Sequence, residues 1–177
     1  MINKNIYPLA LAFIFPAVLS SSAGAADNTV INITATVSAA ACTTSAPASI
    51  PLNFALNAND VAASNANSAW SGDATISLSG CPSTTKSIDA VFSGPAISGD
   101  TSGYQMKNSA GTAVTTGSIQ LAKSADSTLL TNASGTYNVA TASNAASFKV
   151  KARMHSITGA VMPDTYTTAI DVTFNYH

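Results

Sequence analysis

The fold is decided by the stretch at residues 170–177, which reads IDVTFNYH. Apolar side chains stand at Ile170, Val172, Phe174 and Tyr176, and polar side chains stand between them. Side chains on a β-strand point to opposite faces in turn, so this alternation describes one buried face and one wet face. The stretch is therefore predicted to be a half-buried β-strand.

The same period of two runs through most of the chain. Alternating stretches are found at residues 75–79, 88–92, 119–121 and 148–155. Turn-forming residues are clustered between them, at 94–95, 98–103, 108–117, 132–135 and 163–164. Short strands separated by such clusters are typical of an antiparallel β-sandwich. The sequence therefore predicts an all-β domain.

The N-terminus has the pattern of an export signal. Lys4 supplies a positive charge, residues 6–19 are mostly apolar, and small residues follow at Ala23-Gly24-Ala25. This order fits signal-peptidase cleavage. A membrane anchor is the alternative, but the apolar stretch is shorter than the roughly 20 residues that cross a bilayer. We predict a signal peptide at residues 1–25 and a mature chain that begins at Ala26.

Composition narrows the classes of function. Charged residues make up 8% of the chain and the net charge is −1, whereas about 25% of an average globular protein is charged. The chain thus lacks the basic surface of a nucleic-acid-binding protein. Low charge also weakens the usual barrier to self-association. Together with the export signal, this composition favours an extracellular assembly over a cytosolic enzyme.

The sequence contains no catalytic or metal-binding pattern. The only histidines are His155 and His177, neither lies in a motif, and the aspartates are scattered one to a segment. A hydrolytic triad needs a base beside its nucleophile. We therefore expect no enzyme activity, catalytic residue, metal, cofactor, nucleic acid or small-molecule substrate.

The two cysteines, Cys42 and Cys81, are predicted to form a disulfide. An even number of cysteines in an exported chain indicates pairing, and two allow a single connectivity. Closing this loop stabilises the fold by about 4 kcal/mol in the chain-entropy model. The alternative is a reactive or metal-binding pair, which would require further cysteine or histidine partners.

A second alternating run, residues 28–37, follows the predicted cleavage point. One of its faces is formed by Thr29, Ile31, Ile33, Ala35 and Val37. Neither proline nor glycine interrupts the run, so it can be extended and donate a full ladder of hydrogen bonds. Alternation alone leaves open whether it is the first strand of the sandwich or a strand donated to another molecule.

The last alternating run favours donation. An immunoglobulin-like sandwich normally has a further strand beside this one, and the given sequence contains no stretch after residues 170–177 to form it. An unpaired apolar strand exposes backbone donors, backbone acceptors and core. We expect a free N-terminal strand of another copy to supply the missing partner.

The chain resembles the minor, adapter-type subunits of type 1 pili, which belong to the chaperone–usher fimbrial protein family. The resemblance is carried by an ordered set of residues along the mature chain: Ala26-Asp27-Asn28-Thr29, Ser68-Ala69-Trp70, Gly80-Cys81-Pro82, Val91-Phe92-Ser93-Gly94, Ser118-Ile119-Gln120-Leu121, and the final run with its penultimate Tyr176.

This resemblance implies an incomplete immunoglobulin-like β-sandwich that lacks its final strand and carries an N-terminal donor-strand extension. Residues 26–38 would be the extension and residues 39–177 the pilin domain. A periplasmic chaperone would fill the groove first, and at the outer-membrane usher the next subunit's extension would replace it. Thr29, Ile31, Ile33, Ala35 and Val37 would be donor residues, and the strand that receives a donor would be lined by Ile170, Val172, Phe174 and Tyr176. The protein would reach the cell surface through the periplasm and form part of a fimbrium that supports cell adhesion.

Two positions depart from the family pattern, which has glycine in place of Ala35 and in place of Asp164. The methyl group of Ala35 would slow strand exchange or require a wider partner pocket, and Asp tolerates turn geometry at 164. Two other interpretations stay open. One is a major shaft subunit of the same class. The other is a free-standing carbohydrate-binding sandwich whose aromatic rings stack on sugars, the candidate rings being Trp70, Tyr104, Tyr137 and Tyr166.

Overall fold

The computed structural model describes residues 34–36, 38–44, 50–159 and 161–177. The chain divides into two compact units, Met1–Ala35 and Thr36–His177. The predicted signal peptide and most of the predicted donor strand lie outside the described residues. Within the described part of the chain, no helix is long and apolar enough to cross a membrane.

The regular secondary structure of the second unit is almost entirely β-strand. The strands are β1 (Thr43–Thr44), β2 (Ala74–Ser79), β3 (Ser87–Ser93), β4 (Ala96–Ile97), β5 (Asp100–Lys107), β6 (Ala113–Lys123), β7 (Leu129–Leu130), β8 (Thr136–Ala140), β9 (Ala145–Ser156) and β10 (Asp171–Tyr176), with one short 3-10 helix, η1 (Ala58–Val61). The prediction of an all-β fold is confirmed.

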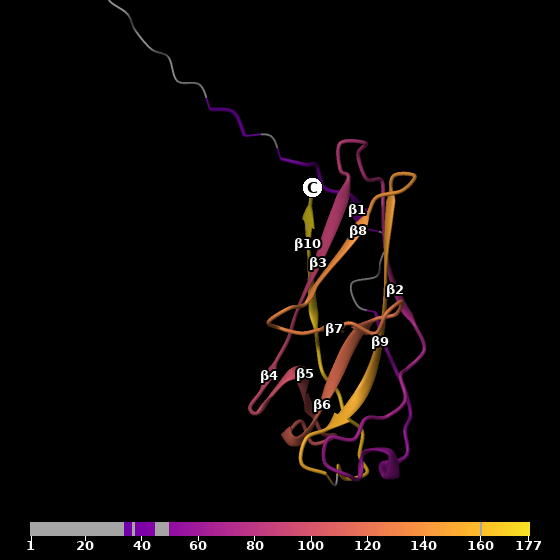
Figure 1. Ribbon diagram of the computed structural model, residues 1–177, viewed down its shortest axis with the longest axis vertical. Helices are drawn as coiled ribbons and strands as arrows, with labels where there is room; N and C mark the ends of the chain where they lie inside the picture. Colours follow the sequence, from indigo (N-terminus) through magenta and orange to yellow (C-terminus); the bar gives the residue numbers. More distant parts are fainter. Residues whose placement is uncertain (1–33, 37, 45–49, 160) are drawn as a thin grey trace, which may run out of the picture. The chain divides into compact units, whose positions relative to one another are not determined.

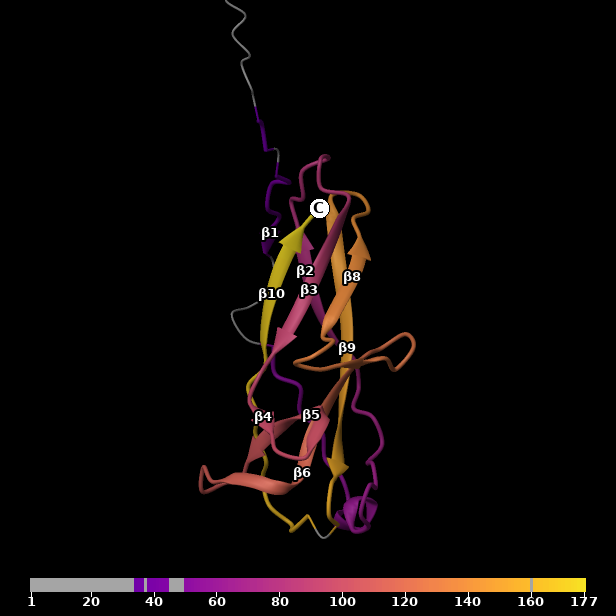
Figure 2. The same ribbon diagram turned by 60° about the vertical axis from the view of Figure 1, so that its left-hand side comes forward.

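The strands form two antiparallel sheets (Figures 1 and 2). The first, sheet A, has the strand order β1-β2-β9-β6-β5-β4, with β7 paired to β6. The second, sheet B, has the order β10-β3-β8. Consecutive strands in the chain often lie in different sheets, as in Greek-key sandwiches, so the inward faces of the two sheets share one core.

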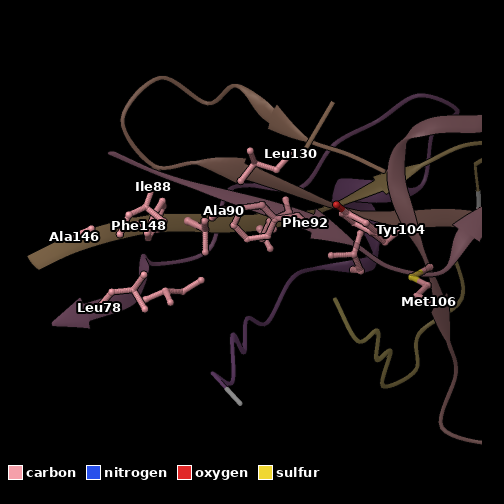
Figure 3. Close-up of a cluster of buried hydrophobic side chains, with 14 of the residues drawn as sticks. Leu78, Ile88, Ala90, Phe92, Tyr104, Met106, Leu130, Ala146 and Phe148 are labelled. Atoms are coloured by element: carbon pink, nitrogen blue, oxygen red, sulfur yellow. The ribbon is translucent and has the colours of Figure 1, made fainter. Parts of the chain in front are cut away.

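The core is built by the residues that the alternation places inward. On β9, Phe148, Val150, Ala152 and Met154 are at most 5% exposed, and on β3 Phe92 is 2% exposed. Figure 3 shows side chains of β3 and β9 gathered in one cluster with Leu78 and Tyr104. Burying each large apolar side chain contributes roughly 1.5–3 kcal/mol.

Two predicted turns are wrong in part, because strands run through them. The cluster at 98–103 contains the start of β5, and the cluster at 108–117 contains the start of β6. The β5–β6 register shifts between Gln105 and Lys107, which breaks the alternation. Gly103 is required in β5 because a Cβ there would lie 2.4 Å from the Ser118 hydroxyl. The glycine that looked like a turn residue therefore permits close strand packing.

A disulfide joins Cys42 and Cys81, which are 39 residues apart in sequence. Cys42 directly precedes β1, and Cys81 follows the end of β2 after one residue, Gly80. The φ of Gly80 is +64°, which suits a residue without a Cβ. The pairing of β1 with β2 covers only two positions, Thr43 with Ser79 and Thr44 with Leu78. The covalent bond therefore secures a strand that its hydrogen bonds alone would hold weakly.

The outer face of sheet A carries a chain of polar side chains. The hydroxyls of Ser102 and Ser118 donate to the two oxygens of Asp100, each at 2.6 Å. Burial would raise the pKa of Asp100, but these hydrogen bonds outweigh it and hold the pKa below its ordinary value. Gln120 donates to Ser102 at 2.7 Å and accepts from Arg153 at 2.8 Å. The network explains why Gln120 is buried between two apolar neighbours.

We predict that Asp100→Asn lowers the free energy of unfolding by about 1 kcal/mol at pH 7, the low end for a charged hydrogen-bonded group because the site is partly exposed. The folded pKa lies below the unfolded value of about 3.9. The ionised group therefore stabilises the fold above that pH, and its contribution is lost as the pH falls through the folded pKa. The difference in the free energy of unfolding between wild type and variant should become smaller below about pH 4.

Urea unfolding of both proteins between pH 2.5 and 7 measures this effect. Asp171→Asn is the matched control, because Asp171 is exposed and its side chain has no hydrogen bond or ion pair among the described residues. A loss for Asp100→Asn that is the same at every pH would contradict the assignment.

Candidate strand-binding surface

Strand β10 lies at the edge of sheet B (Figure 2). It pairs with β3 over six positions, from Asp171 with Ser93 to Tyr176 with Ile88. No strand in the described part of the chain pairs with its other edge. That edge therefore has backbone N–H and C=O groups available for a further strand.

The inward side chains of β10 are covered less completely than those of its neighbour. On β3, Ile88 and Ala90 are fully buried. Their register partners on β10, Tyr176 and Phe174, are only partly buried. The Phe174 ring lies 5.6 Å from the Phe148 ring, so it reaches the core on one side. The paired side chains of β3 and β10 stand at the same level of the core, yet only those of β10 are incompletely covered. This difference indicates that the side of β10 away from β3 lacks a packing partner in the described part of the chain.

A second apolar row comes from the segment at residues 50–56, which belongs to no strand. Its side chains alternate between exposed and partly buried, and the partly buried ones are Ile50, Leu52, Phe54 and Leu56. All four pack against the same core as the inward residues of β10. We call these four residues, together with Ile170, Val172, Phe174 and Tyr176, the open apolar surface.

A hollow of about 430 Å³ lies between residues 52–58 and residues 161–166. Ile119 and Met154 of the core line it together with Leu52, Phe54 and Leu56 of the open apolar surface. The second wall, residues 161–166, precedes Ile170 and β10 in sequence. Met162 on this wall is 70% exposed and is the one large apolar side chain so exposed among the described residues.

Polar contacts fix the other end of β10. The backbone of His177 exchanges hydrogen bonds with Ser87, accepting at 3.2 Å and donating at 2.9 Å. Its imidazole Nε2 lies 3.1 Å from the Asp89 carboxylate. The Asp89 carboxylate also accepts from Asn138 of β8 at 2.7 Å. These contacts tie all three strands of sheet B together, so β10 is held firmly on the side that faces β3.

The structure places the residues predicted to receive a donor, Ile170, Val172, Phe174 and Tyr176, in one partly buried row. Of the predicted donor residues, Thr29, Ile31, Ile33 and Val37 lie outside the described residues. Ala35 is described and is exposed, in no strand.

The row at residues 50–56 was missed, although its sequence, IPLNFAL, alternates like the others. Pro51 and Asn53 stand at the polar positions of this alternation, and both are exposed. The apolar face therefore stays intact, and only Pro51 lacks a backbone N–H for a hydrogen-bond ladder.

The tyrosines do not form a sugar-stacking surface. Tyr104 is fully buried, and its hydroxyl is without a hydrogen-bond partner among the described residues. Burial raises the pKa of Tyr104 to about 12. Tyr137 packs edge-on against Phe148 at 5.4 Å, and the Tyr166 hydroxyl donates to the Met162 carbonyl. Two of these rings are thus parts of the core, and the third is tied to its own loop.

Comparison with known proteins gives matches in structure. No protein-family model matches the sequence, and no characterised protein matches it by sequence. PapA, the rod subunit of the P pilus, superposes with a TM-score of 0.61 at 16% identity, over 78% of this chain and 100% of PapA. A chain from a chaperone–usher pilus, studied for rod uncoiling, superposes with a TM-score of 0.59 at 15% identity, over 86% and 98%.

The CupB6 tip adhesin of Pseudomonas aeruginosa also matches, with a TM-score of 0.50 at 23% identity. That match covers 63% of this chain and 30% of the adhesin, so it concerns one part of a longer protein. These likenesses establish the fold. It is the incomplete immunoglobulin-like sandwich of pilus subunits, and it explains why β10 has one edge without a neighbour.

We predict that Phe174→Ala costs the free mature chain about 1–2 kcal/mol, because its side chain is only partly buried. Phe148→Ala, at a fully buried position, should cost about 3–5 kcal/mol. Urea unfolding followed by circular dichroism measures both. Equal losses would show that Phe174 is already fully packed and that the surface is not open.

Proposed function

We propose that this protein is a structural subunit of a chaperone–usher pilus and polymerises by strand addition. The observation that carries the proposal is the free edge of β10 beside a row of partly buried apolar side chains. An added strand would hydrogen-bond to that edge and bury the row, as in donor-strand complementation. The fold shared with pilus subunits supports the proposal.

The donor in this proposal is the alternating run at residues 28–37 of a neighbouring subunit. Thr29, Ile31, Ile33, Ala35 and Val37 would face the open apolar surface of the acceptor. Three large apolar side chains at roughly 1.5–3 kcal/mol each, with Ala35, give about 5–10 kcal/mol before ordering costs. Because the donor would join the cooperative core, its release requires the domain to open, and dissociation should be very slow.

We place one end of the donor at the start of β10, which follows the wall of the hollow, residues 161–166, in sequence. An antiparallel donor would bring its C-terminal residues to this end, so Val37 would lie there and Thr29 near Tyr176. Ser38 then ends the extension, and the donor's own domain follows, with Cys42 close to its start. This register makes residues 26–38 the extension and residues 39–177 the domain, after removal of residues 1–25.

The partners in this proposal are a periplasmic chaperone, an outer-membrane usher and neighbouring subunits. The chain would pass through the periplasm and end in a surface fimbrium that supports cell adhesion, with no catalytic role.

Within the pilus we propose the adapter position, on the resemblance carried by Ser68-Ala69-Trp70. A shaft subunit of the same class is the alternative. Crosslinking of isolated pili followed by mass spectrometry distinguishes them, because it identifies the neighbours that contact residues 31–37.

A peptide copying residues 28–37 should raise the unfolding temperature of the purified mature chain by more than 10 °C. It would complete the core and bury the open apolar surface, and a gain of 5 kcal/mol corresponds to a shift of about 10–20 °C for a domain of this size. Differential scanning calorimetry with and without peptide measures the shift. A scrambled peptide is the control, and an unchanged transition with the authentic peptide would contradict strand addition.

Ile33→Asp should block donation and leave reception intact. The substitution would place a charge among apolar side chains in the acceptor, where burial without a partner is costly. The variant should still bind the wild-type donor peptide but fail to cap a wild-type subunit in a native-gel polymerisation assay. Asn32→Asp, on the opposite face of the donor, is the matched control. Normal capping by the Ile33 variant would show that the register is wrong.

A further inference from the structure

Three cations lie on the outer face of β9. Lys149, Lys151 and Arg153 alternate with the buried Phe148, Val150, Ala152 and Met154, so they point away from the core. Alternate residues on a strand are about 7 Å apart. The whole chain has seven lysines and arginines, so this one strand face holds three of them.

Among the described residues, these cations have no carboxylate partner. The one ion pair in the described part of the chain joins His177 and Asp89. Instead, the Arg153 guanidinium lies 4.3 Å from the centre of the Trp70 ring, and the Lys151 ammonium lies 5.2 Å from it. Trp70 belongs to the segment that continues the edge of β2, where Ser71 donates to the Ala152 carbonyl at 2.7 Å. The segment therefore carries an aromatic ring to the middle of a cationic face.

The guanidinium of Arg153 is held in place. Its Nε donates to the Gln120 side chain at 2.8 Å, and Gln120, which is 4% exposed, is held by Ser102 and through it by Asp100. This network uses one of the five N–H donors of the guanidinium. The remaining donors have no acceptor among the described residues. An ordered guanidinium with free donors is pre-organised for an anion, because little side-chain freedom is left to lose on binding.

Another copy of this chain supplies few anions to meet this face. The acidic side chains within the described residues mostly have partners of their own: Asp60 with Asn57, Asp73 with Ser124, Asp89 with His177, Asp100 with Ser102, Asp126 with Thr128 and Asp164 with Thr165. Asp171 alone among them has neither a hydrogen bond nor an ion pair. The hydrogen-bonded carboxylates keep their charge, but no three of them are grouped together within the described residues. Another copy therefore offers no row of anions that matches three cations, and we look for the partner outside the polymer.

The surroundings of the cations are polar and hydroxylated. Thr75 of β2 lies directly opposite Lys149, and Ser147 of β9 is on the same face. No large apolar side chain of this face is exposed, so it lacks the apolar centre of a protein–protein interface. Flat hydroxylated strands, an aromatic ring and a row of cations suit a ligand that carries both hydroxyls and regularly spaced anions.

We propose that the outer face of sheet A, centred on Trp70, Lys151 and Arg153, binds an acidic polysaccharide. The carboxylates or sulfates of the polymer would lie along Lys149, Lys151 and Arg153, and its hydroxyls would contact the neighbouring strand. The proposal rests on the proposed function only for the extracellular setting in which such a polymer is met. Sheet A does not contain β10, so this binding requires no strand exchange.

The test uses the full mature chain, with its folded state checked by circular dichroism. Binding to immobilised heparin and to polygalacturonate is measured by biolayer interferometry at several salt concentrations, with dextran as the neutral probe. The triple variant Lys149→Gln/Lys151→Gln/Arg153→Gln should weaken binding to the acidic polymers by at least about 10-fold. Each contact between a cation of the protein and an anion of the polymer contributes to the salt-dependent affinity. The matched control, Lys86→Gln/Lys107→Gln/Lys123→Gln, removes the same charge elsewhere and should change binding less than about two-fold.

Two single variants separate positioning from charge. Gln120→Met keeps every cation but releases the guanidinium, and Arg153→Lys keeps the charge but loses the planar fork. Each should weaken binding by about three-fold to five-fold at a temperature where circular dichroism shows the variant to be folded. Equal losses in the two triple variants, or no measurable binding of either acidic polysaccharide, would overturn the proposal. So would equal affinity for poly-aspartate, which has carboxylates without sugar hydroxyls. All these readouts are independent of polymerisation, so failure here leaves strand addition untouched.

Discussion

The constraint on which this structure depends is the unpaired edge of β10. A strand in a sandwich normally has hydrogen-bonded neighbours on both sides and a covered inward face. Here β3 is the hydrogen-bonded neighbour on one side of β10. No neighbour stands on its other side among the described residues, and the inward side chains of β10 remain partly exposed. The partial exposure of the open apolar surface follows from this one missing neighbour. Our proposal accounts for it by a strand that another subunit supplies.

The outer face of sheet A has a different organisation. Its polar groups satisfy one another in a chain that runs from Asp100 through Gln120 to Arg153. Satisfied polar groups make a rigid surface, since each one fixes the rotamer of the next. The two surfaces thus differ in chemistry. One is apolar and partly open, and the other is polar, internally hydrogen-bonded and positively charged along β9.

Period-two alternation predicted the strands with one buried face well. β3, β9 and β10 follow it residue by residue. β3 and β9 have a hydrogen-bonded strand on each side, and β10 is aligned by its six-position pairing with β3 and by the core. The short strands β1, β4, β7 and β8 were not predicted. β5 was not predicted either, and β6 was predicted only at residues 119–121, because in both another contact overrides the pattern. In β5 the close approach to Ser118 requires Gly103, and in β6 the buried Gln120 occupies a position where alternation predicts solvent. Both depend on tertiary contacts, which are not visible in local sequence.

The disulfide has a mechanical consequence for a fibre joined by strand addition. In such a fibre, pulling reaches the domain through the segment that precedes Cys42. Two register pairs between β1 and β2 would open readily under that pull, one after the other. The disulfide instead transmits the force to the end of β2. This strand pairs with β9 over six positions and lies between β1 and β9 in sheet A. The load is thereby carried by the six-position pairing of β2 with β9, and the two-position pairing of β1 with β2 is protected.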